Sequence, residues 1–206
     1  MQAFTRVTGI AAPLDRPNVD TDQIIPKQFL KRIERSGYGP FLFFDWRYQG
    51  DGETENPDFE LNHDPWRHAP ILLAGRNFGC GSSREHAAWA LEDYGVRAVI
   101  APSFSDIFRS NALKIGLLPV ALPEEVVARW MDLAREEPGL QATVDLEKGY
   151  VEFAGERRPI ELDDDSRERL VGGLDDIALS LRHADAITAY EAQRPERLPT
   201  TSGLRG

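Results

Sequence analysis

Four consecutive apolar residues followed by a glycine-rich turn constrain the fold of this chain more than any other feature. The run Ile71–Ala74 has the length and continuity of a strand that is buried on both faces. The turn at 75–81 leads into a predicted helix at 85–94, which ends before Gly95, and a second strand is predicted at 96–101. A strand, a helix and a strand within about thirty residues form a βαβ unit, so the pattern predicts parallel strands in an α/β fold.

The segments before this unit predict less regular structure. A strand is predicted at 4–14, and a short helix with proline at its start is predicted at 26–35. Residues 45–70 are rich in Asp, Asn, Gly, Pro and aromatic side chains and show no hydrophobic period. We therefore expect an irregular insertion there.

The segments after the unit first continue the α/β pattern and then change. A helix is predicted at 103–112, a strand at 117–120 and an amphipathic helix at 123–137. The remaining predictions are a hairpin of 142–146 and 150–153, a strand at 158–162, helical structure at 163–193 broken at Gly172 and Gly173, and a disordered tail at 194–206. We therefore expect a single domain over 1–193.

Charge and cysteine content exclude several classes of protein. The 24 Lys and Arg against 34 Asp and Glu residues give a net charge of −10, whereas a general binder of nucleic acid or anionic membrane needs a basic face. The single cysteine, Cys80, allows no intramolecular disulfide and cannot hold an iron–sulfur cluster. The N-terminus has no apolar run like that of a signal peptide, and no apolar run is long enough to span a bilayer. We expect a cytoplasmic protein that binds neither nucleic acid nor membrane.

The turn between the buried strand and the helix carries most of the candidate chemistry. Ligands of open α/β sheets bind beyond the carboxyl ends of the strands, which is where this turn lies. Its glycines let a ligand approach the backbone, and the helix that follows presents free N–H groups to an anion. Arg84 adds donors suited to a carboxylate or a phosphate. The turn lacks the lysine of a P-loop, the third glycine of a dinucleotide site and the pattern of a nucleophile elbow.

Several residues of this turn also have a purely structural interpretation. Ser82 and Glu85 have the spacing of a capping box, so Ser82 is expected to cap the helix, which does not exclude catalysis. Arg84, taken alone, is more often part of a surface ion pair, and His86 in a first helical turn is more often structural than catalytic.

Three further side chains allow two interpretations each. Cys80 could act as a nucleophile at a helix N-terminus, but a lone cysteine is usually inert. Asp20 and Asp22 have a spacing compatible with a metal, but a role in stabilising a turn is expected more often.

Three segments in order along the chain resemble one family. They are 18–26 (NVDTDQIIP), 77–86 (NFGCGSSREH) and 103–108 (SFSDIF). Each is similar to the small subunit of 3-isopropylmalate dehydratase, an enzyme of leucine biosynthesis, and the resemblance runs from about residue 4 to residue 193. The run Gly-Ser-Ser-Arg-Glu-His is shared with the wider aconitase superfamily.

The resemblance implies a fold, a partner and a reaction. The implied fold is the swivelling β/β/α domain found at the C-terminal end of aconitase, here with a C-terminal helical extension. The implied partner is a large subunit that carries a [4Fe-4S] cluster and forms a heterodimer with this chain, which itself binds no cofactor and no metal. The implied enzyme is a hydro-lyase that interconverts 2-isopropylmalate and 3-isopropylmalate, both small dicarboxylic acids, through 2-isopropylmaleate.

The resemblance also implies roles for four residues. Ser82 matches the serine that removes a proton from carbon, and Arg84 matches an arginine that grips a substrate carboxylate. Ser83 matches a residue that helps to bind the carboxylate. Asp22 matches an acidic residue that orients a histidine of the large subunit.

Substrate selectivity is assigned to a separate stretch of the chain. Because isopropylmalate carries an apolar side group, we expect residues 28–38 to form a specificity loop lined by Phe29, Leu30 and Ile33. Three other functions stay open: the small subunit of a citraconate (methylmalate) or homoaconitate hydratase, a non-catalytic anion-binding module, and a hydrolase that uses Cys80.

Overall fold

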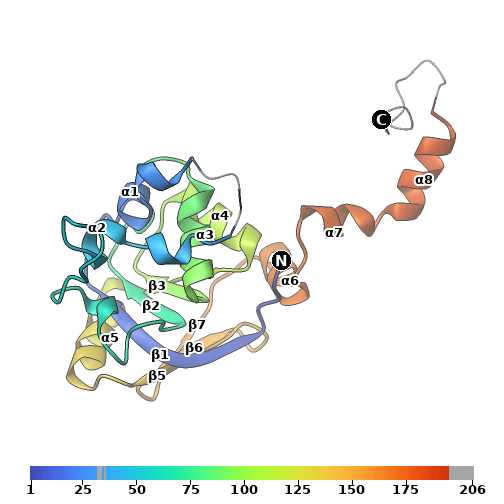
Figure 1. The fold of residues 1–206 in the computed structure, drawn as a ribbon. Coiled ribbons are helices and arrows are strands. Elements are labelled where there is room, and N and C mark those ends of the chain that lie inside the picture. The colour runs from blue at the N-terminus through green and yellow to red at the C-terminus, as the bar shows by residue number, and fades with distance from the viewer. Residues whose placement is uncertain (32–33, 35, 195–206) are drawn as a thin grey trace.

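A mixed sheet of seven strands runs through the molecule in the order β4-β3-β2-β1-β5-β6-β7 (Figure 1). The structure is a computed structural model that describes residues 1–31, 34 and 36–194. The strands are β1 (Arg6–Leu14), β2 (Ile71–Ala74), β3 (Ala98–Ala101), β4 (Leu118–Ala121), β5 (Gln141–Asp145), β6 (Tyr150–Phe153) and β7 (Glu156–Pro159).

One half of the sheet is parallel, as the βαβ pattern predicts. The second half of β1 pairs in parallel with β2, β2 with β3, and β3 with β4. Helix α3 (Glu85–Tyr94) connects β2 to β3, and α4 (Asp106–Ile115) connects β3 to β4. The carboxyl ends of these strands therefore meet at one edge of the sheet, where Leu14 is in register with Ala74.

The other half of the sheet is antiparallel and begins on the same strand. Residues 6–10 of β1 pair with β5, which continues through β6 to β7. The predicted hairpin is confirmed, but the last strand begins at Glu156 and ends at Pro159 instead of covering 158–162. The reason is a tight turn at Ala154 and Gly155, whose φ angles of 48° and 77° suit a two-residue hairpin connection.

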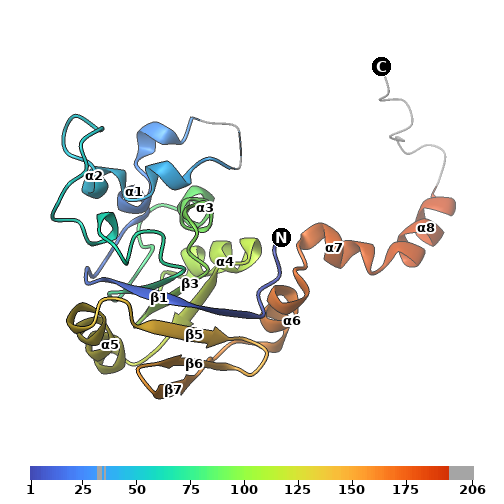
Figure 2. The same ribbon diagram turned by 60° about the horizontal axis from the view of Figure 1, so that its bottom comes forward.

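The two faces of the sheet carry separate hydrophobic cores. Helices α3 and α4 cover one face, and α5 (Glu124–Glu136) covers the other (Figure 2). The predicted apolar stripe of α5 is buried, with Trp130 fully enclosed. Both faces of the parallel strands are therefore covered, which explains their continuous apolar sequence.

The segments between β1 and β2 are mostly irregular, as expected. They contain the short helices α1 (Thr21–Ile24) and α2 (Phe44–Arg47) and single 3₁₀ turns at Lys27–Phe29, Gly39–Phe41 and Glu60–Asn62. Helix α1 was not predicted, and the helix predicted at 26–35 is a 3₁₀ turn over Lys27–Phe29; Arg32, Ile33 and Arg35 lie outside the described residues. Helix α4 begins at Asp106 because Ser105 caps it, three residues later than the pattern indicates.

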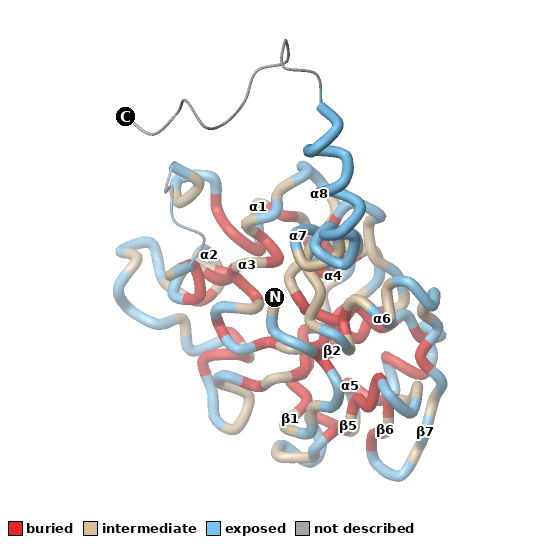
Figure 3. Tube along the Cα trace, turned by 90° about the vertical axis from the view of Figure 1, so that its right-hand side faces the viewer, coloured by how far each residue is buried: buried red, intermediate tan, exposed pale blue. Residues whose placement is uncertain are grey.

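The C-terminal part of the chain is helical and leaves the body of the molecule. Helix α6 (Asp164–Gly172) packs against the body of the molecule through the buried side chain of Leu170. The predicted break in the helix falls at Gly173, which has a φ of +63°. Helices α7 (Asp176–Leu181) and α8 (Ala184–Ala192) then extend outward (Figure 1), and α8 is exposed along its whole length (Figure 3). The predicted tail, except for Arg194, lies outside the described residues, within which no helix is long and apolar enough to cross a membrane.

Candidate functional site

Three loops converge where the parallel strands end. Residues 75–84, hereafter the site loop, follow β2 and lie between the segment 18–22 after β1 and the segment 103–105 after β3. A parallel bridge joins Asp20 to Cys80, and another joins Phe78 to Phe104. The loop predicted from the sequence is therefore held on both sides by residues that lie far away in the chain.

The segment after β3 anchors the first half of the site loop. The backbone N–H of Phe78 donates to the carbonyl of Ser103 at 3.0 Å, and the N–H of Ser105 donates to the carbonyl of Phe78 at 3.1 Å. The Ser105 hydroxyl donates to the carbonyl of Gly79 at 2.5 Å and also accepts from the N–H of Phe108, where it caps α4. One serine thus connects a helix start to the loop.

The segment after β1 anchors the second half. The N–H of Gly79 donates to the carbonyl of Val19 at 2.8 Å, and the N–H of Thr21 donates to the carbonyl of Cys80 at 2.9 Å. The Thr21 hydroxyl donates to the carbonyl of Ser82 at 2.9 Å. Thr21 was not singled out from the sequence, because a contact between residues 61 positions apart leaves no local pattern.

Two glycines of the site loop are required by these close approaches. Gly79 has a φ of +73°, and a Cβ there would lie 2.2 Å from Cγ of the buried Phe108 ring. Gly81 has a φ of +88°, and a Cβ there would lie 3.2 Å from the Cβ of Asp20. A residue with a Cβ would be strained at either position, because its φ is positive and its Cβ would lie too close to a neighbouring side chain. Glycine is therefore needed where the loop packs against Phe108 and Asp20.

The four predicted site residues lie on two segments that contact each other, the site loop and α1. Ser82 and Ser83 are exposed on the site loop. Nη1 of Arg84 donates to Oδ1 of Asp22, and the two side chains are 19% and 48% exposed. Among the described residues, Asp22 is the hydrogen-bond partner of this guanidinium, which keeps further donors for a ligand.

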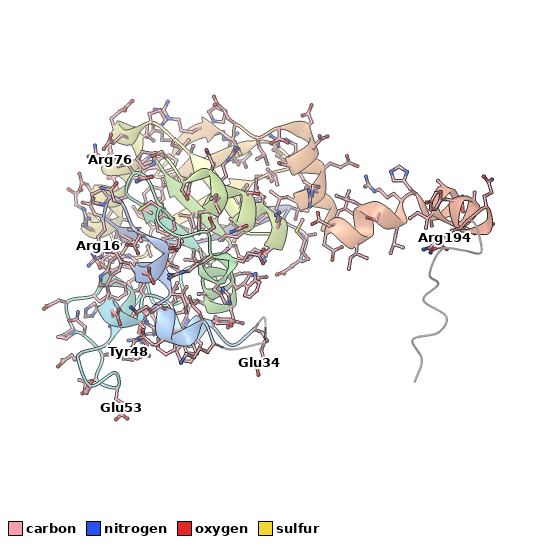
Figure 4. The ribbon with its side chains drawn as sticks, turned by 90° about the horizontal axis from the view of Figure 1, so that it is seen from above. Arg16, Glu34, Tyr48, Glu53, Arg76 and Arg194 are labelled. Carbon is pink, nitrogen blue, oxygen red and sulfur yellow. The ribbon has the colours of Figure 1, made fainter. Side chains whose placement is uncertain are left out.

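The other arginine of the site loop does not join this group. The Arg76 side chain is 60% exposed at the rim of the molecule (Figure 4), and its guanidinium lies 3.9 Å from the carboxylate of Glu124. Such an exposed contact adds little to stability or to ligand binding. Arg84 is therefore the arginine that the fold places beside the two serines.

The expectation that Ser82 caps α3 is wrong. The helix begins at Glu85, and its N-cap position is occupied by Arg84, whose extended backbone has no side-chain capping bond. The carbonyl of Ser82 is instead held by Thr21, which leaves the Ser82 hydroxyl outside the helix start. The capping box of this region belongs to α1, where Asp20 and Gln23 bond reciprocally, so the turn-stabilising interpretation holds for Asp20.

Cys80 and His86 have structural surroundings. The Cys80 thiol donates to the carbonyl of Asn18 at 3.3 Å, and burial together with the nearby Asp20 carboxylate raises its pKa, which disfavours a thiolate nucleophile. The His86 ring contacts Tyr38 edge-on with 5.4 Å between ring centroids and lies beside Trp89. Burial lowers the pKa of His86, so the neutral ring is favoured.

The proposed specificity residues are partly built into the core. Phe29 stacks on Phe41 with 4.2 Å between centroids and meets Phe44 edge-on at 4.8 Å. Leu30 is partly buried against the same core cluster, and Ile33 lies outside the described residues. These contacts fix Phe29 in place, and its role as pocket lining stays a prediction.

The described residues do not assemble a metal site. Nowhere in residues 1–31, 34 and 36–194 do three His, Cys, Asp or Glu side chains meet as metal ligands. Asp22 is engaged by Arg84 and Asp20 by the start of α1, which accounts for both carboxylates of the suspected pair.

Sequence models of two families match the chain. The aconitase C-terminal domain matches residues 1–125, and the C-terminal domain of the 3-isopropylmalate dehydratase small subunit matches residues 176–203. The first match contains the whole site loop and the segments 18–22 and 103–105 on either side of it. The second match covers α7 and α8.

Curated relatives and a solved structure agree with these matches. The 3-isopropylmalate dehydratase small subunit of Rhodopirellula baltica is 59% identical over 94% of this chain and 100% of its own length. That of Koribacter versatilis is 57% identical over 93% of this chain and 98% of its own length. A crystal structure of 3-isopropylmalate dehydratase from Methanocaldococcus jannaschii aligns with a TM-score of 0.62 and 27% identity, over 90% of this chain and 99% of that one.

Proposed function

The chain belongs to the family of 3-isopropylmalate dehydratase small subunits, and we propose from this premise that it supplies the proton-transfer half of a hydro-lyase active site. The observation that carries the proposal is the pairing of Arg84 with Asp22 beside the exposed Ser82. A base and a carboxylate-binding cation are two of the groups that dehydration of a small hydroxy dicarboxylic acid requires. The proposed reaction interconverts 2-isopropylmalate and 3-isopropylmalate through 2-isopropylmaleate.

Arg84 binds a carboxylate of the substrate in this proposal. Its contact with Asp22 uses one guanidinium nitrogen, and the planar group carries five N–H donors. The remaining donors suit a second carboxylate, and Asp22 prevents the side chain from turning away. Ser83, exposed between Ser82 and Arg84, assists at the same carboxylate.

Ser82 acts as the general base. A serine hydroxyl is a poor base in water, so its alkoxide needs nearby positive charge. The guanidinium of Arg84 and the start of α3, which no side chain caps, both favour an anion at this place. General base catalysis contributes typically about 10²–10⁴-fold to a rate, so the rest of the acceleration has to come from elsewhere in the complete site.

The rest of the site belongs to a large subunit. A [4Fe-4S] cluster on that subunit would supply the Lewis-acid chemistry of such a reaction, and the residues of this chain do not fit one. The sequence has one cysteine, and the thiol of that residue already donates to Asn18. Asp22 keeps about half of its side chain exposed, which leaves room for a histidine of the large subunit. A cytoplasmic location is part of the same proposal, because such a cluster and a free thiol suit a reducing compartment.

The test is a substitution of the proposed base in the complete enzyme. The chain is combined anaerobically with the large subunit from the same organism, and turnover of 3-isopropylmalate is measured for wild type, Ser82→Ala and Cys80→Ser. Removal of the base is expected to lower kcat by at least about 100-fold. Cys80→Ser, two residues away and still able to donate to Asn18, is expected to keep wild-type turnover.

Two outcomes would change the proposal. If Ser82→Ala retained turnover, the site loop would be an anion-binding module without a catalytic serine. If citraconate or homoaconitate were turned over faster than 3-isopropylmalate, the hydro-lyase chemistry would stand and the assigned substrate would be wrong.

A further inference from the structure

Thr21 holds the backbone on both sides of Gly81. Its N–H donates to the carbonyl of Cys80, and its hydroxyl donates to the carbonyl of Ser82, each at 2.9 Å. We infer that Thr21 is a positioning residue, which sets where the Ser82 hydroxyl lies and thereby how fast that group takes a proton. The inference rests on the proposed function of Ser82, and it assigns to Thr21 a role separate from the carboxylate binding of Arg84.

Ser82 needs such a residue, because little else fixes its hydroxyl. Among the described residues, no side chain or backbone group bonds the Ser82 hydroxyl, which is exposed. Its position therefore depends on the main chain. The residue before it, Gly81, has a φ of +88° and the widest choice of backbone conformations of any residue type. Without a fixed carbonyl at Ser82, the loop could turn at Gly81 and move the hydroxyl.

Thr21 is itself held firmly. The residue is 2% exposed, and it is the first residue of α1. The reciprocal capping bonds of Asp20 and Gln23 define that helix start, and Ile24 anchors the helix in the core. Since α1 also packs against α3, the Thr21 hydroxyl is fixed relative to the helix that follows the site loop.

The same short helix positions both halves of the proposed chemistry. Thr21 holds Ser82, and the next residue, Asp22, holds Arg84. Two adjacent residues of α1 therefore contact two loop residues, Ser82 and Arg84. These two contacts together set the distance between the proposed base and the cation. Because the Asp22–Arg84 contact does not depend on the Thr21 hydroxyl, loss of that hydroxyl should affect proton transfer more than substrate binding.

The experiment separates the two effects with a matched pair of variants in the complete enzyme. Thr21→Val keeps the shape of the side chain and removes the donor, and Thr21→Ser keeps the donor. A displaced reacting group can cost about 100-fold in rate. We expect Thr21→Val to lower kcat by about 10–100-fold with KM within about threefold of wild type, and Thr21→Ser to restore kcat. If Thr21→Val fails to fold, Thr21→Ala replaces it.

A double variant shows whether Thr21 acts through Ser82. If it does, Thr21→Val added to Ser82→Ala should cause almost no further loss, because the group that it positions is already absent. Multiplied losses, or a Thr21→Val enzyme with wild-type kcat while Ser82→Ala is inactive, would overturn the inference alone. Full turnover of Ser82→Ala would instead overturn the proposed function.

Discussion

The site loop and the C-terminal arm, which is formed by α7 and α8, differ in opposite ways in secondary structure and in burial. The site loop has no regular secondary structure, yet Phe78 and Gly79 within it are buried and bonded to two other segments. The arm is helical, yet every described residue from 182 onward is exposed. Figure 4 shows Arg194 far from the sheet at the end of this arm. Regular hydrogen bonding and a fixed position in the fold are therefore separate properties.

The difference comes from where the hydrogen bonds of each region go. Those of the site loop reach segments that lie far away in sequence, so the loop can move only if those segments move. Those of the arm lie mostly within its own helices. Helix α8 has nine residues, and an isolated helix of that length is only marginally stable in water. The arm also exposes four large apolar side chains: Ile177, Leu181, Ile187 and Tyr190.

The largest effect is expected where the loop is most tightly packed. Gly79→Ala places a Cβ against Phe108 and keeps a positive φ, so overpacking and backbone strain should together lower the free energy of unfolding by about 2–5 kcal/mol. Urea unfolding of the isolated chain measures this change. Gly155→Ala is the matched control, because its φ of +77° is nearly the same and nothing lies within 4 Å. Equal losses in both variants would show that packing against Phe108 contributes nothing.

Hydrogen exchange compares the two regions directly. The amides of Phe78 and Gly79 donate to Ser103 and Val19, so they should open only with the body of the protein. The amides of Ile187 and Tyr190 lie in an exposed helix and should exchange at least about 100-fold faster. Amide exchange followed by NMR resolves both sets. Similar rates would mean that the arm is as stable as the loop.

The smallest effect is expected from removing the end of the arm. A chain that stops after Leu181 loses only exposed described residues and the ion pair of Arg182 with Glu168, so its free energy of unfolding should change by less than about 1 kcal/mol. Leu170→Ala, which leaves a cavity where the buried side chain of α6 packs, is the positive control and should cost about 2–5 kcal/mol in the same urea titration. If the truncation lowered the free energy of unfolding by as much as Leu170→Ala, the end of the arm would contribute to the stability of the body.

Local patterns predicted the central unit of the fold well. Strand β2 and helix α3 have the bounds that the apolar run and Gly95 indicate. The stripe of α5 and the hairpin of β5 and β6 were also visible, because burial on one face leaves a period in the sequence. Helix α1 was missed, since four residues are too few to show a period.

Capping was harder to assign than helix position. The spacing of Ser82 and Glu85 fits a capping box, and so does that of Asp20 and Gln23, but only the second pair forms one. The spacing of two residues shows that their groups could form a capping box. It does not show that the carbonyl of Ser82 accepts a hydrogen bond from the distant Thr21.

What the sequence alone determined is the family, the parallel unit and the identities of Ser82, Ser83, Arg84 and Asp22 as candidate residues, because these depend on residue types at short spacings. Only the tertiary structure decided that Asp22 pairs with Arg84 and that Thr21 holds Ser82, across 62 and 61 residues of chain. Those contacts exist because β1 lies parallel to β2, which brings the ends of two distant strands to one edge of the sheet.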